Sequence, residues 1–283
     1  MIRILPLFIL LLFTSCTHRK ADTRPLLAAT IEPVRYVVES IAGNRYRVHT
    51  LMPAGASPET YEPTPAQMVE LENCEAVFRV GTLGYERTTL PRLLSTVPHT
   101  AVFDIGDDVQ PLTDLTQPAG SETNVDPHVW MSAFSLNVMA HSVYRALCRL
   151  DAEHEAYYRQ NLARFCARHR HLDDSLRVAL SRARPRSFLI HHPALAYFAR
   201  NYGLRQIAVE HEGKEPSAAR IRQLVTQAAA DSVRTVFISK EHTGRAARRI
   251  AEQTGARVVI INPLDYDVPS QLRAISAALT GPQ

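Results

Sequence analysis

The stretch DAEHEAYYRQNLARFCARHRHLDDSLRVALSRARP, from Asp151 to Pro185, decides the fold of this chain. It belongs to a longer run, residues 128–184, that contains no glycine and no proline, although the chain has 11 and 18 of them. Asp151 suits a helix N-cap, and the acidic residues after it suit the positive end of a helix dipole. We therefore predict one long helix, which ends where Pro185 disfavours helix in the residue before it.

One face of this predicted helix is apolar, because its members recur at the three- and four-residue steps of a single helical face. They are Tyr158, Leu162, Phe165, His169, Leu172, Leu176 and Ala179. At about 1.5 Å per residue the helix is roughly 50 Å long, which exceeds the radius of a compact domain. We interpret it as a strut across two lobes. The alternative, a long helix within one all-α domain, does not explain the β-branched runs on both sides of it.

Short strands alternate with helices on both sides of the strut. Before it, the predicted strands are 26–31, 46–52, 76–80 and 101–105, and the helices are 34–42 and 65–73. After it, the predicted strands are 187–190, 206–209, 235–239 and 258–261, and the helices are 195–202, 217–230, 245–254 and 270–279. This alternation predicts two α/β lobes with parallel sheets. We divide the chain into an N-terminal lobe (26–150), a linking helix (151–184) and a C-terminal lobe (185–283).

The composition limits the classes of protein to consider. With 283 residues, of which 46% are hydrophobic, the chain can bury one large core or two modest ones. The net charge is +4, but arginine and lysine are scattered, so nothing indicates a nucleic-acid partner. Three of the four cysteines, Cys74, Cys148 and Cys166, lie on predicted helices among apolar neighbours. They form no Cys-x-x-Cys pair, which favours buried thiols over a disulfide or a metal site.

The amino terminus has the pattern of a targeting segment. Arg3 precedes a continuous apolar stretch, residues 4–13, which is too short to span a bilayer and suits a signal peptide. The stretch runs into Thr14-Ser15-Cys16, which resembles a bacterial lipobox. We predict a signal peptide at 1–15, acylation of Cys16, and a polar tether at 16–25. The alternative is an ordinary signal peptide with an incidental cysteine.

Polar side chains follow several predicted strands or begin helices. Glu59 lies in a loop with four prolines after the second strand, and His128 opens the run without glycine. The pair His191-His192 and Asn262 directly follow strands of the second lobe. Ligands of α/β lobes meet the loops beyond the carboxyl ends of strands, so these residues predict a site between the lobes. Imidazole and carboxylate suit a divalent transition metal, but there is no local motif such as His-Glu-x-x-His, and spacing alone leaves metal binding open.

At these positions the sequence resembles the metal-binding solute-binding lipoproteins of ABC transporters for zinc and manganese, the ZnuA/TroA-like family. The segments that carry the resemblance are PAGASPETYEPTP from Pro53, GTLGYE from Gly81, DPHVW from Asp126, HPALAYFARNYGL from His192, KEPSAARI from Lys214 and VIINPL ending at Leu264. Their common order makes them jointly specific, and they cover nearly everything after the tether. The resemblance implies two α/β lobes bridged by a long helix, with a metal between them.

The resemblance assigns the ligand positions residue by residue. His128 matches the second ligand of the family and His192 the third. The family usually has histidine at the first position, where this chain has Glu59, and aspartate at the fourth, where it has Asn262. A neutral ligand has become anionic and an anionic one neutral, so one carboxylate still faces the dication. This conserved charge favours a retained site.

Other residues near these positions have secondary roles in this interpretation. Asn262 either adds a carbonyl oxygen to the metal or only orients a neighbour. Asp265 and Asp267 are reserve carboxylates if their loop turns inward. His191 and His211 are expected to be structural neighbours.

The resemblance implies a receptor, lipid-anchored outside the cytoplasmic membrane, that captures a divalent metal and delivers it to an ABC permease without catalysis. Zinc is the expected cargo and manganese the next, and we expect a monomer. Two alternatives remain. Two histidines and one glutamate with an open position are also a catalytic zinc set, which would define a hydrolase. The other is a surface adhesin with a structural metal. No motif for a general base or an oxyanion donor supports the hydrolase.

Overall fold

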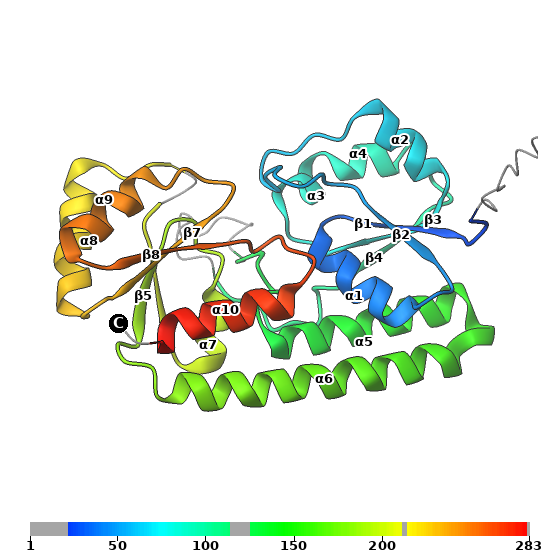
Figure 1. Cartoon of the computed structure of the whole chain (residues 1–283). Coiled ribbons are helices and arrows are strands. Elements are labelled where there is room, and N and C mark those ends of the chain that lie inside the picture. Colours follow the sequence, from blue (N-terminus) through cyan, green and yellow to red (C-terminus); the bar gives the residue numbers. More distant parts are fainter. Residues whose placement is uncertain (1–21, 114–124, 211–213, 282–283) are drawn as a thin grey trace, which may run out of the picture.

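The computed structural model describes residues 22–113, 125–210 and 214–281. The predicted signal peptide, Cys16 and His211 lie outside these residues. Two four-stranded sheets form separate lobes, and all of their neighbouring strands are parallel (Figure 1). The predicted class, two α/β lobes bridged by a long helix, is confirmed.

The N-terminal lobe has the strand order β2-β1-β3-β4. Its strands are β1 (Leu26–Ala29), β2 (Arg47–Thr50), β3 (Cys74–Arg79) and β4 (Ala101–Asp104). Its helices are α1 (Glu32–Ala42), α2 (Pro65–Glu72), α3 (Gly84–Thr88) and α4 (Leu90–Leu94). The sequence did not predict the two short helices α3 and α4. Five residues are too few to show a helical period, and Pro91 stands inside the second of them.

The C-terminal lobe repeats this topology with the order β6-β5-β7-β8. Its strands are β5 (Ser187–Ile190), β6 (Arg205–Ala208), β7 (Thr235–Ser239) and β8 (Arg257–Ile261). Its helices are α7 (Ala196–Tyr202), α8 (Ala218–Ala230), α9 (Arg245–Thr254) and α10 (Val268–Thr280). The chain leaves β5 toward β6 on one side and later returns to β7 on the other. Ligands of open α/β sheets bind at such a switch point, beyond the carboxyl ends of the strands.

The run without glycine contains the predicted long helix and, before it, a second helix that the sequence did not predict. They are α5 (Ala133–Leu150) and α6 (Glu155–Ser181), separated by a 3-10 turn at Ala152–His154. Asp151 is therefore not the N-cap of the long helix. It ends α5, and its carboxylate accepts hydrogen bonds from His154 Nδ1 (2.8 Å) and Tyr158 Oη (2.6 Å). With 27 residues, α6 is about 40 Å long rather than 50 Å.

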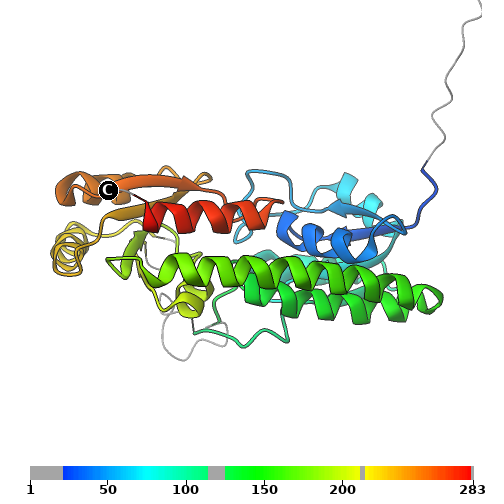
Figure 2. The ribbon, with the colours of Figure 1, turned by 60° about the horizontal axis from the view of Figure 1, so that its bottom comes forward.

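The long helix α6 runs beneath both lobes and packs on α5, α1 and α10 (Figure 2). The predicted apolar face is the buried one as far as Leu176, and Leu180 extends it. Only Ala179 is partly exposed. Because α1 belongs to the first lobe and α10 to the second, this one face joins the two lobes.

Cys74, Cys148 and Cys166 are free thiols; Cys74 is buried and the other two are partly buried. Cys74 begins β3 rather than lying on a helix, which corrects its predicted position. In the described ranges, no helix combines the length and the hydrophobicity needed to cross a membrane.

A buried histidine lies where α6 meets the first lobe. His169 Nδ1 donates to the carbonyl of Phe165 (2.9 Å), so its Nε2 accepts from the Tyr36 hydroxyl (3.1 Å). The imidazole stacks on the Phe165 ring at 3.8 Å. Burial lowers the pKa of His169 to about 4. The folded protein therefore keeps this ring neutral.

We expect this histidine to make the protein sensitive to acid. The unfolded chain binds a proton at His169 near pH 6.5, whereas the folded chain does so only near pH 4. Its contribution is complete above pH 6.5 and falls by up to about 3 kcal/mol as the pH decreases toward 4. Urea unfolding at pH 7 and at pH 5, with chelator present, measures this loss of unfolding free energy. We expect a smaller loss in His169→Phe than in the wild type. The loss should be unchanged in His171→Gln, which alters an exposed position of α6. A His169→Phe protein that loses as much stability between pH 7 and pH 5 as the wild type would contradict the assignment of this loss to His169.

Candidate metal centre

The loop between β2 and α2 brings Glu59 to the boundary between the lobes. The backbone N–H of Tyr85 donates to the Pro58 carbonyl (3.0 Å), and the Glu59 N–H donates to Ser57 Oγ (3.3 Å). A Cβ atom at position 84 would lie 3.0 Å from the Glu59 carbonyl oxygen, so glycine there permits the close approach. The Glu59 side chain itself is 51% exposed. It lies at the mouth of the site.

His128 is held from the segment that leads into α5. Asp126 Oδ1 accepts hydrogen bonds from both the backbone N–H (2.8 Å) and the ring Nδ1 (2.9 Å) of His128. Both side chains are buried. A carboxylate can only accept, so Nδ1 carries the proton and Nε2 presents its lone pair. Two residues on, the buried indole of Trp130 donates from Nε1 to the Pro263 carbonyl (2.8 Å), which links this segment to the second lobe.

His192 is held in the same way from the second lobe. It follows β5, and Glu210, which follows the adjacent strand β6, accepts from its Nδ1 at 2.7 Å. Although burial opposes protonation, the hydrogen bond that His192 donates to Glu210 and the charge of Glu59 raise the pKa of His192. Because Nδ1 donates to Glu210, Nε2 carries the lone pair of the neutral ring and points it into the site. The negative charges of Glu210 and Glu59 favour a positive charge there.

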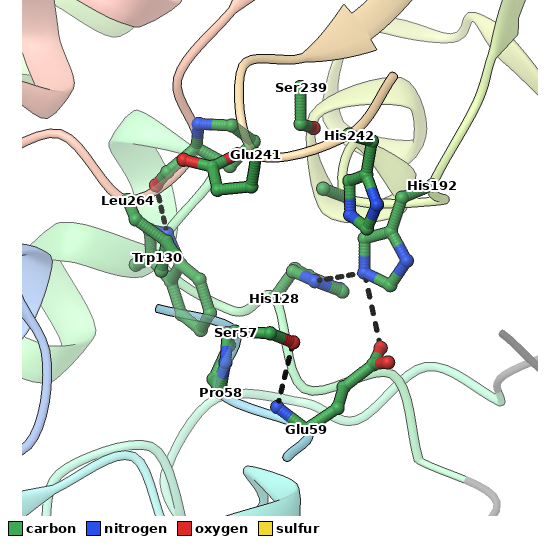
Figure 3. A pocket seen from close by; sticks show the side chains of 12 residues that line it. Ser57, Pro58, Glu59, His128, Trp130, His192, Ser239, Glu241, His242 and Leu264 are labelled. Carbon is green, nitrogen blue, oxygen red and sulfur yellow. Dashed lines mark hydrogen bonds and ion pairs between the residues drawn. The ribbon is translucent and has the colours of Figure 1, made fainter. Parts of the chain in front are cut away.

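The Nε2 atoms of His128 and His192 and a carboxylate oxygen of Glu59 lie close together (Figure 3). His192 Nε2 lies 3.2 Å from His128 Nε2 and 3.5 Å from Glu59 Oε1. Two ligands bonded to one tetrahedral zinc at about 2.0–2.1 Å are roughly 3.3 Å apart. Two lone pairs that face each other at this distance repel unless a cation or a proton lies between them. The donor set and its spacing thus fit one divalent metal.

A small cavity adjoins these three side chains. Its volume is about 30 Å³, and Trp130, Pro263 and Leu264 supply its apolar wall. Further polar lining comes from Ser57, from Ser239 at the end of β7, and from Glu241 and His242 just beyond it. We did not predict Glu241 and His242 from the sequence, although they follow a predicted strand just as His192 does. In the described part of the chain, Glu241 Oε1 is buried without a hydrogen-bond partner.

Asn262 does not line this cavity. Its Nδ2 donates to Asp265 Oδ2 (2.9 Å), and both residues line a neighbouring cavity instead. Its Oδ1 is buried and has no hydrogen-bond partner among the described residues. Asp267 caps α10 by accepting from the Ser270 N–H (3.1 Å). The structure thus brings together Glu59, His128 and His192, and it holds Asn262, Asp265 and Asp267 apart from them.

Two α/β lobes with a cation site between them, joined by a long helix, define a two-lobed metal-binding protein. Residues 27–273 match the family described as zinc-uptake complex component A periplasmic, ZnuA. The chain belongs to this family.

Individual relatives agree with this membership. A crystal structure of a ZnuA deletion mutant with zinc bound is 32% identical, with a TM-score of 0.84, over 92% of this chain and 99% of that one. The zinc-binding lipoprotein AdcA of Streptococcus pneumoniae is 26% identical over 278 residues, 90% of this chain and 53% of AdcA. This chain therefore spans about half the length of that relative. A putative metal-binding protein of Chlamydia trachomatis is 25% identical over 96% of this chain and 98% of its own length.

Proposed function

We propose that this protein is the extracytoplasmic receptor of an ABC importer, which captures zinc, or with lower affinity manganese, and delivers it to a permease. The observation that carries the proposal is the pair of Nε2 atoms 3.2 Å apart, each with its tautomer fixed by a carboxylate on the opposite nitrogen. Glu59, His128 and His192 are the proposed ligands. Asn262 is proposed to orient Asp265 rather than to bind the metal.

The size of the cavity supports an ion as the cargo. Pockets for small organic molecules usually measure about 300–1,000 Å³. The space beside the histidines, about 30 Å³, suits an ion and its last water. A hydrolase would need room for a substrate at the open position of the metal. The family is a transport component and not a class of enzyme, which argues against the hydrolase on independent grounds.

The donor set supports zinc over manganese. Imidazole nitrogen suits zinc, whereas manganese prefers carboxylate, carbonyl and water oxygens. Two of the three proposed ligands are imidazoles. The related ZnuA structure with zinc bound and the relative named zinc-binding lipoprotein AdcA support the same choice. Glu59, the only carboxylate of the set, lies at the exposed mouth of the site.

The proposal is tested by titrating the full chain, solubilised in detergent and stripped with chelator, with zinc and with manganese in a calorimeter. We expect tight zinc binding and a manganese affinity at least tenfold lower, about 1.4 kcal/mol. Absence of zinc binding would contradict the proposal. So would hydrolysis of generic ester or peptide substrates by the zinc-loaded protein.

The location of the receptor is also part of the proposal. We propose that Cys16 is acylated, that residues 16–25 tether the body, and that a monomer docks on the permease. The lipobox-like Thr14-Ser15-Cys16 and the lipoprotein AdcA among the relatives support the anchor. An anchored receptor stays within reach of its permease, which raises its effective concentration there.

A further inference from the structure

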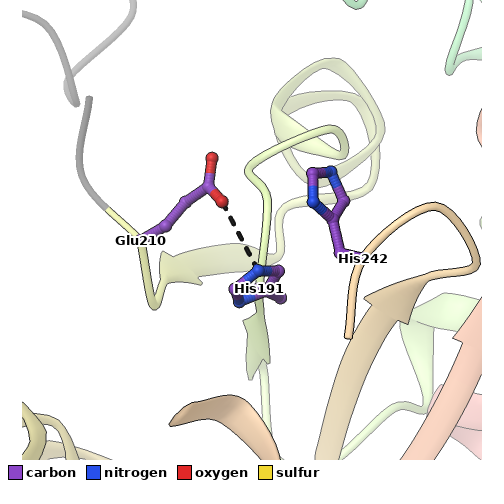
Figure 4. Close-up of side chains that lie close together, drawn as sticks. All are labelled: His191, Glu210 and His242. Carbon is purple, nitrogen blue, oxygen red and sulfur yellow. Dashed lines mark ion pairs between the residues drawn. The ribbon is translucent and has the colours of Figure 1, made fainter. Parts of the chain in front are cut away.

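We propose that a second divalent metal ion binds beside the first, on the ring nitrogens of His191 and His242 and the carboxylate of Glu210. This inference rests on the proposed function only in placing the first ion at Glu59, His128 and His192. One potential ligand atom from each of the three residues lies within 4.8 Å of the others (Figure 4). None of the three was predicted to be a ligand from the sequence.

The topology of the second lobe builds this cluster. Glu210, His191 and His242 follow strands β6, β5 and β7, which are neighbours in the sheet. The backbone continues the sheet past the strand ends, because the His191 N–H donates to Phe237 (2.9 Å) and the Glu210 N–H to His191 (3.1 Å). His191 and Glu210 are therefore fixed by the hydrogen bonds of the sheet, and His242 follows in the turn after β7. They stand at the switch point of the sheet.

The burial of two of these three side chains indicates a preformed site and not a chance grouping of surface residues. His191 is 4% exposed and Glu210 is 6% exposed. Within the described ranges, His191 Nδ1 has no hydrogen-bond partner, which is costly for a buried polar atom. His191 Nε2 lies 3.5 Å from Glu210 Oε2, close to the roughly 3.3 Å between two ligands of one zinc.

The second ion would not share a ligand with the first. Glu210 uses Oε1 for His192 Nδ1 and directs Oε2 toward His191. The ring of His242 lies beside that of His192, with the centroids 5.4 Å apart and 23° between the planes. The proposed ligands of the second ion, His191, Glu210 and His242, are all different from those of the first. Glu210 and His192 would thus connect the two ions, and repulsion between dications makes the second bind more weakly.

The test is a zinc titration of the chelator-stripped full chain in detergent, with bound metal counted by elemental analysis. We expect two ions for the wild type, and one tight ion for both His191→Leu and His242→Gln. His242 is only partly buried, so its variant keeps the test informative if the core does not tolerate leucine at position 191. His171→Gln, at an exposed position, is the matched control and should retain both ions.

His128→Ala separates this inference from the proposed function. Loss of the tight ion with retention of the weaker one supports the second site. A wild type that binds a single ion, lost in His128→Ala and kept in His191→Leu, overturns the second site and leaves the proposed function intact. A single ion lost in His191→Leu and His242→Gln but kept in His128→Ala supports the cluster and contradicts the proposed ligand set instead. Retention of two ions in His191→Leu and in His242→Gln, as in the control His171→Gln, would also overturn the second site.

Discussion

His128→Ala and His192→Ala are each expected to weaken zinc binding at the interlobe site by at least tenfold, about 1.4 kcal/mol. Each substitution removes one of the two lone pairs that face each other at 3.2 Å. It also leaves a buried carboxylate, Asp126 or Glu210, without the imidazole that it holds. The remaining donors are one imidazole and the exposed Glu59, which is fewer than zinc sites usually require.

Calorimetry of the chelator-stripped variants measures this loss. The matched control is Asn262→Ala, because Asn262 lies outside the cavity and bonds to Asp265 at 2.9 Å. We expect its zinc affinity to stay within about threefold of the wild type, less than 0.7 kcal/mol. Unchanged affinity in both histidine variants would rule out the site. A loss in Asn262→Ala as large as theirs would instead return Asn262 to the ligand set.

Cys16→Ala is expected to abolish both acyl labelling and retention of the protein in the membrane fraction. Acylation needs the thiol of this residue, and a lipid chain contributes about 0.8 kcal/mol per buried CH₂ to membrane binding. No helix in the described part of the chain is long and apolar enough to cross a membrane, so the prediction assigns retention to the lipid.

Growth with a labelled fatty acid, followed by fractionation, measures both effects. The matched control is Cys148→Ala, which removes a free, partly buried thiol on α5 and should leave labelling unchanged. A labelled Cys16→Ala protein would show that the lipobox interpretation is wrong. An unlabelled wild type would show the same.

Periodicity was enough to predict most of the fold. Strands 187–190 and 235–239 were predicted with the bounds that β5 and β7 have, because short β-branched runs between turns leave few alternatives. The buried face of α6 followed from the three- and four-residue spacing. The prediction started the long helix at Asp151, four residues before α6 begins, and did not include α5. The break between the two helices contains no glycine or proline, and in it Asp151 accepts hydrogen bonds from His154 and Tyr158.

Only part of the candidate site could be predicted from the sequence. Sequence alone placed polar residues at strand ends, and the resemblance of the DPHVW and HPALAYF segments selected His128 and His192 among the histidines. Neither indicated which residues hold these rings. Glu210, the partner of His192, is 18 residues away in sequence and comes from the adjacent strand. No local pattern relates the two.

The sequence by itself determined the two α/β lobes, the apolar face of the helix that joins them, and the strand ends that carry imidazole and carboxylate. Only the tertiary structure decided that Asn262 lies outside the cavity, that Glu210 faces both His191 and His192, and that His242 stacks beside them. The physical reason is one of scale. Local periodicity sets which face of an element is buried, whereas a metal site depends on separations of a few ångströms between side chains. Those separations are set by the order of strands in the sheet, in which β5 lies between β6 and β7.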